Sequence, residues 1–437
     1  MNIQETMAFI HDEKWRGSKP GLSRTQALLA ALGNPEKKLR YVHIAGTNGK
    51  GSTAACMESI LRHAGYKTGL YTSPYILEFG ERMRVNGKNI PPEALCRLAE
   101  QVRPAAEAME DAPTEFELVT AMAFYYFAQE QCDLVVLEVG LGGETDATNV
   151  IPVPEAAVIT PIALDHTREL GPTLGDIARA KGGIIKEGGM VVSAGGCPEA
   201  DRVLAEICRE KHAKLTQVDW DSLQVEKLTL QGNTFSYGGM THLFLPLAGS
   251  YQPGNGALAV ETARQLAAKY PKITEAAVRE GLAQVRWPGR FEVLRETHPA
   301  VILDGGHNPH GVQGTIRSLQ AQFPGQKIWF LMGVMADKDV TGILQLLLPT
   351  AAGFITVTPD NPRAMAGAEL AKIIQKLGGK AQAAATIPEG VQQVFREAGE
   401  NGVICALGTL YFSGDVRRAM AFLPRQDFTN SNKPSII

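Results

Sequence analysis

The sequence predicts an α/β protein with two units, each built around a mostly parallel sheet. Residues 41–63 read as a short apolar strand, a glycine-rich turn and a helix, and residues 301–407 alternate between strand-like runs and helical patterns. Such alternation is typical of parallel sheets whose faces are covered by helices. Between these stretches, residues 223–247 hold short alternating runs separated by glycine-containing turns, which predict a small antiparallel meander.

The remaining elements are predicted from hydrophobic periodicity and from turn residues. In the first unit we expect strands at 66–71, 134–139 and 156–160, and helices at 25–32, 116–129, 173–186, 254–269 and 273–284. The aromatic face of the helix at 116–129 is expected to be core. In the second unit we expect strands at 301–304, 328–334, 354–358 and 403–407, and helices at 311–322, 339–348, 365–377 and 388–399.

Length and composition indicate a globular protein with more than one domain. The chain has 437 residues, of which 44% are apolar and 20% charged, and this length exceeds one typical core. A new strand–helix alternation starts after Arg290 to Pro299. We therefore expect an N-terminal unit of residues 1–294 and a C-terminal unit of residues 295–437.

Charge and cysteine content are those of a cytoplasmic protein that binds neither nucleic acid nor a membrane. A net charge of −3 provides no electrostatic basis for binding nucleic acid or an anionic membrane. No apolar run approaches the roughly 20 residues that cross a bilayer, and the polar stretch Met1–Trp15 is unlike a secretory signal. The six cysteines are scattered, so reduced thiols are expected. We expect a monomer.

The glycine-rich turn after the first strand predicts a phosphate-binding loop. Backbone N–H groups at such a turn, together with the positive end of the following helix, can surround an anion. Lys50 would place a charge on the outer phosphates, and Ser52 or Thr53 could face Mg²⁺. The strict Walker spacing is absent, because Ile44 replaces its first glycine and Gly51 separates the lysine from the serine. A tight turn is the alternative, but the lysine, hydroxyls and strand–helix context favour nucleotide binding.

Three side chains lie at or just beyond the carboxyl ends of predicted strands, where ligands gather in open α/β sheets. They are Ser73, Glu138 and His166. A carboxylate buried at a strand end needs a partner, and a cation is one explanation for Glu138. The alternatives are a turn or cap role for Ser73, an ion pair with a lysine for Glu138, and a structural role for His166.

Sequence blocks along the whole chain resemble the folylpolyglutamate synthase/dihydrofolate synthase family, a branch of the Mur ligase superfamily. Their number and order carry the resemblance. The blocks are HIAGTNGKGST (43–53), TSPYILEFGERMRVNG (72–87), FELVTAMAFYYF (116–127), LEVGLGGETDATN (137–149), ITPIALDH (159–166), TLGDIARAKGGIIK (173–186), LPLAGSYQPGNGALA (245–259), WPGRFE (287–292), LDGGHNPHG (303–311) and MADKD (335–339).

The resemblance implies a P-loop Mur-ligase-type ATPase domain with the meander, a Rossmann-like C-terminal domain and an active site between them. It implies that ATP converts a carboxylate into an acyl phosphate, which the amine of L-glutamate attacks. The implied ATP-binding residues are Gly46, Thr47, Asn48, Gly49, Lys50, Gly51, Ser52, Thr53, Asn255, Arg290, Asp304 and His307. Ser73, Glu138 and His166 are the implied ligands of Mg²⁺, of which two ions are expected. Lys50, Lys181, His166 and Glu138 are the implied catalytic residues.

Lys181 occupies the position of the lysine that is carbamylated in this superfamily. A carbamate turns the cationic side chain into an anionic oxygen ligand. Its formation needs a neutral amine, so a desolvated lysine with a lowered pKa is expected. The alternative is a solvated lysine on a helix.

The chain departs from the family pattern near the expected substrate pocket. Glu144 and Thr145 replace the usual arginine and leucine, and Ala180 replaces the usual glutamate before Lys181. Discrimination between acceptors is expected from the loops at 75–86 and 142–148. The candidate substrate residues there are Tyr75, Arg82, Glu144 and Asp146.

The function predicted first is addition of L-glutamate to a reduced folate, with dihydropteroate as the alternative acceptor. Three rival functions remain open: a Mur-type ligase acting on another acid, a non-catalytic nucleotide-binding relic, and a simple P-loop hydrolase. The relic has no chemical need for the full set of site residues, and the hydrolase has no use for an acceptor.

Overall fold

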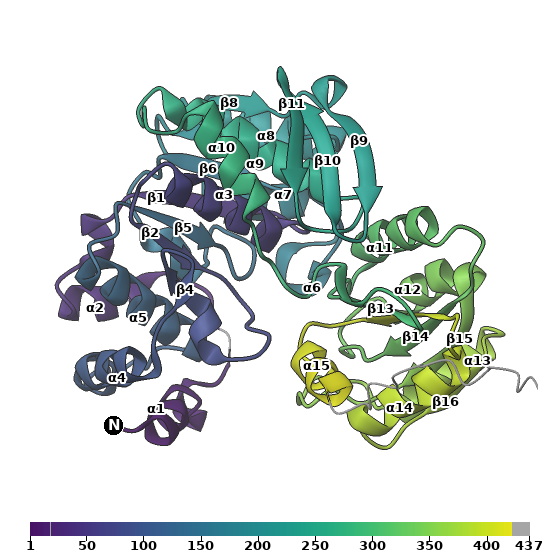
Figure 1. Ribbon diagram of the computed structural model, residues 1–437. Helices are drawn as coiled ribbons and strands as arrows, with labels where there is room; N and C mark the ends of the chain where they lie inside the picture. Colours follow the sequence, from purple (N-terminus) through teal and green to yellow (C-terminus); the bar gives the residue numbers. More distant parts are fainter. Residues whose placement is uncertain (18, 422–437) are drawn as a thin grey trace, which may run out of the picture.

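The computed structural model describes residues 1–17 and 19–421, which form two α/β units (Figure 1). The first unit contains an eight-stranded sheet in the order β4-β3-β2-β5-β1-β6-β7-β8. The six strands β2, β5, β1, β6, β7 and β8 are parallel to one another. The short β3 and β4 extend the sheet beyond β2 and pair antiparallel. The strands are β1 (Tyr41–Ala45), β2 (Thr68–Tyr71), β3 (Met83–Val85), β4 (Lys88–Asn89), β5 (Leu134–Glu138), β6 (Ala156–Ile159), β7 (Met190–Ser193) and β8 (Lys214–Gln217).

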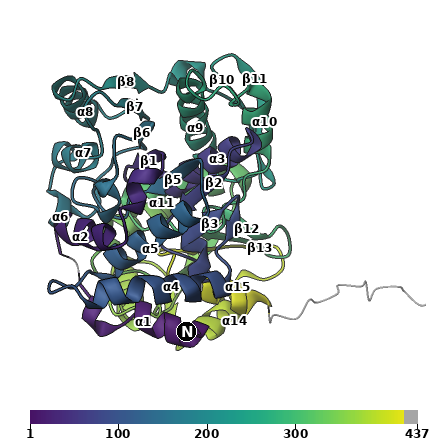
Figure 2. The same cartoon turned by 90° about the vertical axis from the view of Figure 1, so that its left-hand side faces the viewer.

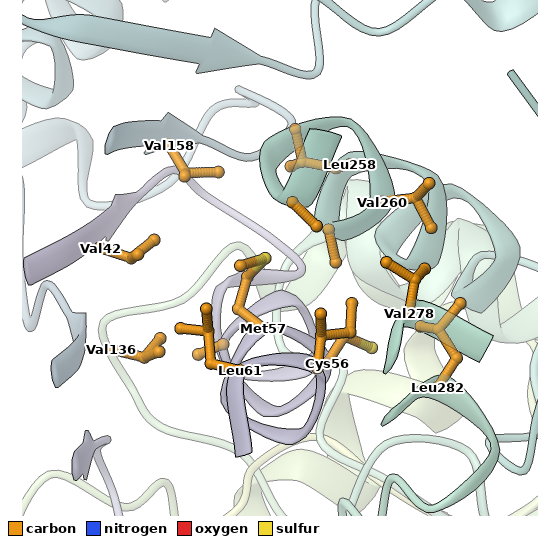
Figure 3. Close-up of a cluster of buried hydrophobic side chains, with 14 of the residues drawn as sticks. Val42, Cys56, Met57, Leu61, Val136, Val158, Leu258, Val260, Val278 and Leu282 are labelled. Carbon is orange, nitrogen blue, oxygen red and sulfur yellow. The ribbon is translucent and has the colours of Figure 1, made fainter. Parts of the chain in front are cut away.

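The central strands β1 and β5 are buried along their whole length, as parallel strands covered on both faces must be. On one face, Val42, Val136 and Val158 of the sheet meet Met57 and Leu61 of a central helix (Figure 3). Three helices build that layer: α3 (Lys50–His63), α9 (Gln252–Ala267) and α10 (Glu275–Ala283).

A second helical layer covers the other face, where α1 packs on α4 and α4 on α5 (Figure 2). Phe124 and Phe127 of α5 are fully buried in its core, which confirms the expectation that the aromatic face is core. Toward β8, a smaller cluster joins two helices to β6 and β7. The two helices of the smaller cluster are α7 (Leu174–Gly182) and α8 (Pro198–Glu210). The other helices of the first unit outside the α3 layer are α1 (Ile3–Ile10), α2 (Ser23–Ala31), α4 (Pro92–Glu107), α5 (Glu115–Gln129) and α6 (Thr167–Leu170).

The predicted antiparallel meander is confirmed. It consists of β9 (Gln224–Thr229), β10 (Gly232–Tyr237) and β11 (Met240–Leu245), in the order β11-β10-β9. Phe235 and Leu245 turn inward and join the core that α3 and α9 form with the large sheet. The meander therefore extends the first unit and is not a separate domain.

The second unit contains a six-stranded sheet in the order β12-β13-β17-β14-β15-β16, with all but β12 parallel. This confirms the predicted mostly parallel second sheet. Its strands are β12 (Glu292–Arg295), β13 (Ala300–Asp304), β14 (Ile328–Met332), β15 (Ala351–Thr356), β16 (Ala381–Ala383) and β17 (Val403–Leu407). Its helices are α11 (Pro309–Gln322), α12 (Val340–Leu347), α13 (Gly367–Lys376), α14 (Ile387–Ala398) and α15 (Ser413–Ala421).

The boundary predicted after residue 294 needs correction. It falls inside β12, whose residues Glu292 and Val293 pair with Leu303 and Ile302 of the second sheet. The ladder hydrogen bonds of β12 therefore belong to the C-terminal unit, which begins before Glu292.

Among the helices of residues 1–17 and 19–421, none combines the length and the apolar character needed to span a membrane.

We predict that Gly281→Ala destabilises the first unit. A Cβ at this position would lie 2.5 Å from Cα and 2.8 Å from the backbone N of Ile60, so α10 and α3 would have to separate. Overpacking of this kind costs about 1–3 kcal/mol, against a helix-propensity gain of roughly 1 kcal/mol. The free energy of unfolding from denaturant titration should fall, whereas the exposed Glu280→Ala in the same helix should change it little. An unchanged or raised stability for Gly281→Ala would contradict this packing.

Candidate active site

A cavity of about 1580 Å³ lies between the two units, and most of the predicted site residues line it. From the first unit these are Gly46, Thr47, Asn48, Gly49, Lys50, Gly51, Ser52, Ser73, Arg82, Glu138, Glu144, Asp146, His166, Lys181 and Asn255; from the linker and the second unit, Arg290, Asp304 and His307. Thr53 and Tyr75 do not line it. Thr53 is wholly buried in α3, rotated away from the loop by the helical repeat, and the Tyr75 ring packs on Phe79.

The glycine-rich loop connects β1 to α3 and requires glycine at two points of close approach. Gly46 has a φ of +140°, and a Cβ there would lie 1.9 Å from Oγ1 of Thr160. At Gly51, a Cβ would lie 2.7 Å from the ring of Trp287. The linker residue Trp287 therefore rests directly on the first turn of α3.

Two lysines converge on one carbonyl of this loop. Nζ of Lys50 donates to the Gly46 and Thr47 carbonyl oxygens, both at 3.2 Å. Nζ of Lys181 donates to the same Gly46 oxygen at 2.8 Å. Burial lowers the pKa of Lys50, and the charge of Glu138 opposes that shift.

Lys181 is buried, with 5% of its surface exposed. Burial, and then the charge of Lys50, lower the pKa of Lys181 to about 7. A substantial neutral fraction therefore exists near neutral pH. The alternative of a solvated helix lysine is wrong, because the α7 face that carries it packs toward the loop.

Glu138 ends β5, and the Ser73 backbone follows the neighbouring β2. The Ser73 N–H donates to Oε2 of Glu138 at 3.1 Å. Burial raises the pKa of Glu138, while the charge of Lys50 acts in the opposite direction. Within residues 1–17 and 19–421, Glu138 forms no ion pair within 4.0 Å, so the ion-pair alternative is not supported.

His166 follows β6 with a left-handed φ of +50° and adjoins a cluster that reaches across to the second unit. Nζ of Lys338 lies 2.7 Å from Oδ1 of Asp165 and 3.2 Å from Nε2 of His166. Burial, opposed by the charge of Asp165, lowers the pKa of His166 to about 4. Burial alone raises the pKa of Asp165, yet its contact with His307 and the charge of Lys338 bring that pKa well below its ordinary value.

The loop after β5 places its two carboxylates differently. Asp146 is buried, and its oxygens accept from the backbone N–H of Thr148 at 3.0 Å and of Leu141 at 2.9 Å, so this side chain holds its own loop together. Glu144 is exposed at the cavity wall, and its N–H donates to the Ala180 carbonyl at 2.9 Å. The two departures from the family pattern, at 144 and 180, are therefore in direct contact.

Asp304 ends β13 and organises the facing wall of the cavity. Its Oδ2 accepts from the hydroxyl of Tyr251 at 2.6 Å and from the N–H of Phe291 at 2.8 Å. Its Oδ1 accepts from the N–H of Gly306 at 2.7 Å. Through these bonds, one carboxylate joins the start of α9, the linker and the loop before α11.

Several residues of this site were not assigned roles from the sequence. Asn308 exchanges hydrogen bonds with Asn48 of the phosphate loop at 3.1 and 3.2 Å. Lys338, Asn308 and Trp287 lie inside the MADKD, LDGGHNPHG and WPGRFE blocks, and Asp165 precedes His166. Their membership in those blocks was the only sequence signal that they belong to the site. Their hydrogen bonds could not be predicted, because the bonded residues lie up to 260 positions apart in the chain and no local pattern links them.

Comparisons with known proteins agree on the family. Two family profiles match, the Mur ligase middle domain over residues 44–263 and the Mur ligase glutamate ligase domain over 289–410. Folylpolyglutamate synthase of Lacticaseibacillus casei is 40% identical over 381 residues, covering 84% of this chain and 87% of that protein. Dihydrofolate synthase/folylpolyglutamate synthase of Bacillus subtilis is 37% identical, covering 95% and 99%.

Solved structures show the same fold over nearly the whole chain. The folylpolyglutamate synthase of Mycobacterium tuberculosis complexed with ADP matches with a TM-score of 0.88 at 29% identity, covering 97% of this chain and 99% of that one. That of Thermotoga maritima matches with a TM-score of 0.82 at 34% identity, covering 96% and 97%. Together with the two profiles and the sequence blocks, these matches show that this chain belongs to the folylpolyglutamate synthase/dihydrofolate synthase family of Mur ligases.

Proposed function

We propose that this protein is an ATP- and Mg²⁺-dependent ligase that joins L-glutamate to the carboxylate of a reduced folate. The observation that carries the proposal is the convergence of Lys50 and Lys181 on the Gly46 carbonyl, inside a cavity closed by the second unit. Two lysines at a glycine-rich loop favour binding of a phosphate chain. The names of the relatives supply the substrate class.

The proposed reaction has two displacements. An oxygen of the acceptor carboxylate attacks the γ-phosphorus of ATP, the bond to the β-phosphate oxygen breaks, and ADP leaves. The glutamate amine, after losing a proton, attacks the carbonyl carbon of the acyl phosphate, and inorganic phosphate leaves as the amide forms. Lys50 and Arg290, both at the cavity wall, are suited to stabilise the charge on the phosphoryl oxygens.

The donor set at the loop fits a hard divalent cation. Glu138 and Ser73 offer oxygen, and His166 offers a ring nitrogen; among the described residues, Oε1 of Glu138 accepts no hydrogen bond. Among those residues, no group of three His, Cys, Asp or Glu side chains is arranged to hold a metal ion by itself, so water and substrate oxygens would complete the coordination, as is usual for Mg²⁺. Two Mg²⁺ ions, when bound, would neutralise phosphate charge.

Carbamylation of Lys181 is part of the proposal. The neutral amine of Lys181 would attack the carbon of CO₂ and lose a proton, leaving an anionic oxygen donor beside the phosphate loop. Burial and the pKa of about 7 support it. Action as a monomer in the cytoplasm is also part of the proposal; the six cysteines are free thiols.

Dihydropteroate is the second candidate acceptor. Several relatives carry names that include dihydrofolate synthase, and a matching Escherichia coli structure is of FolC in complex with DHPP and ADP. In this chain, exposed Glu144 adds a carboxylate to the cavity wall where the family usually has arginine. A negative charge there disfavours the glutamate tail of a folate if the tail lies near it, which makes the loop the place to test acceptor choice.

We predict that Lys50→Ala lowers ligase turnover at least 100-fold, about 2.7 kcal/mol of transition-state stabilisation. Lys50 is expected to interact with the negative charge of the phosphates and not to pack in the hydrophobic core, so the protein should stay folded. The measurement is ADP release with folate acceptor and glutamate, with circular dichroism to check folding and the exposed Lys372→Ala as the matched control. Normal turnover in folded Lys50→Ala would remove the nucleotide assignment.

We predict that Lys181 carries a carbamate whose occupancy rises as pH increases through about 7, because only the neutral amine reacts. Carbon NMR with labelled bicarbonate should show a carbamate signal that is absent in Lys181→Ala. That variant should be nearly inactive, and short carboxylic acids should restore part of its turnover. Full activity of Lys181→Ala, or a free amine under saturating bicarbonate, contradicts the role.

We predict that reduced folate is preferred over dihydropteroate and that Glu144→Arg strengthens this preference, because the substitution replaces a negative charge that repels a glutamate tail with a positive one. The measurement is kcat/KM for each acceptor in both proteins, with Glu280→Ala, remote from the site, as control. A preference for dihydropteroate above tenfold, about 1.4 kcal/mol, would reverse the ranking. If the ratio of the two kcat/KM values is the same in Glu144→Arg as in the wild type, this loop does not determine which acceptor is preferred.

A further inference from the structure

The contacts of Lys338 resemble the environment of a bound metal ion. Its ammonium lies 2.7 Å from a carboxylate oxygen of Asp165 and 3.2 Å from Nε2 of His166. An ammonium group has only donors, so Nε2 of His166 must accept and its lone pair is engaged. A divalent cation would use that same lone pair.

The position of Lys338 is specified by both units. The lysine belongs to the loop before α12, in the second unit, whereas Asp165 and His166 belong to the first. Lys338 and Asp165 side chains are each only 9% exposed. Asp165 also accepts from Nδ2 of Asn308 at 2.9 Å, and its Oδ2 lies 3.4 Å from Nε2 of His307, so three groups of the second unit hold the carboxylate toward that unit.

We propose that Lys338 is a positioning residue whose contact with Nε2 of His166 and the binding of a divalent cation at that same nitrogen exclude one another. An ammonium and a divalent cation at hydrogen-bond distance from the same nitrogen would repel strongly in a buried site. Metal entry therefore requires Lys338 to withdraw, which weakens one link between the units. The inference deepens the proposed function, because it rests on His166 binding a cation.

The first test is Mn²⁺ titration of the nucleotide-free protein, followed by the loss of the free-ion EPR signal. Lys338→Met and Lys338→Gln should bind Mn²⁺ about tenfold more tightly than wild type, a gain of about 1.4 kcal/mol. The exposed Lys327→Met, in the same unit, should match wild type. The gain should vanish in His166→Ala/Lys338→Met, which assigns it to the imidazole. Equal or weaker binding by folded Lys338→Met and Lys338→Gln overturns the inference.

The second test follows the lysine itself in the wild-type protein. Acetylation by a limiting amine reagent, read by mass spectrometry, should be slow at Lys338 without metal and faster with saturating Mn²⁺. The rate at Lys327 should not change. A metal-independent or reduced rate at Lys338 overturns the inference. If glutamate ligation is normal in that same protein, the proposed function still stands; absence of ligation would overturn the function whatever the Mn²⁺ result.

Discussion

The Gly46 carbonyl oxygen, which accepts from Nζ of both Lys50 and Lys181, is the contact around which this structure is arranged. Bringing two cations to one oxygen in a buried site is costly without nearby negative charge. Glu138, Asp146 and Asp165 surround the loop and oppose the lowering of the Lys50 pKa, and Asp146 and Asp165 also oppose the lowering of the Lys181 pKa. All three carboxylates lie at the same edge of the sheet, because Glu138 ends β5, Asp146 follows β5 and Asp165 follows the parallel β6.

The same sheet edge determines where the second unit can sit. Asp304 at the end of β13 ties the linker and the start of α9 together, while Asn308 and Lys338 reach the loops of the first unit. The carboxyl ends of strands from both sheets therefore face one cavity. An arrangement of this kind allows a nucleotide to contact both units at once, so binding and relative placement of the units are linked.

The sequence was sufficient for several elements whose signal is local. The strand, turn and helix of 41–63, the meander and the alternation of the second unit follow from periodicity and turn residues, and all are present. The short β3, β4, β12 and β16 were missed, because two to four residues carry too little pattern. The boundary error at residue 294 has the same origin, since β12 is recognised only through its pairing with β13. The prediction also left out β7, β8, α1, α4, α8 and α15.

The site residues also divide into those with a local sequence signal and those recognised only through contacts in the folded chain. Lys50, Glu138 and Lys181 were proposed as site residues because each lies in a distinctive local block, and all three line the cavity. Thr53 was included for its position in the block, yet helical rotation buries it. Asp165 and Lys338, by contrast, are recognised as site residues only through their mutual contact, and they lie 173 positions apart in the chain. A contact of that kind depends on how the two units meet, which no window of sequence contains.

The reciprocal amide pair of Asn48 and Asn308 has a consequence for how this protein can evolve. Each amide donates to the other's oxygen, at 3.1 and 3.2 Å, and an aspartate or leucine at either position would leave the partner without a donor or an acceptor. The phosphate loop and the loop before α11 are thus constrained as a pair. Variation at these two positions should be correlated across related sequences, even though they are encoded 260 residues apart.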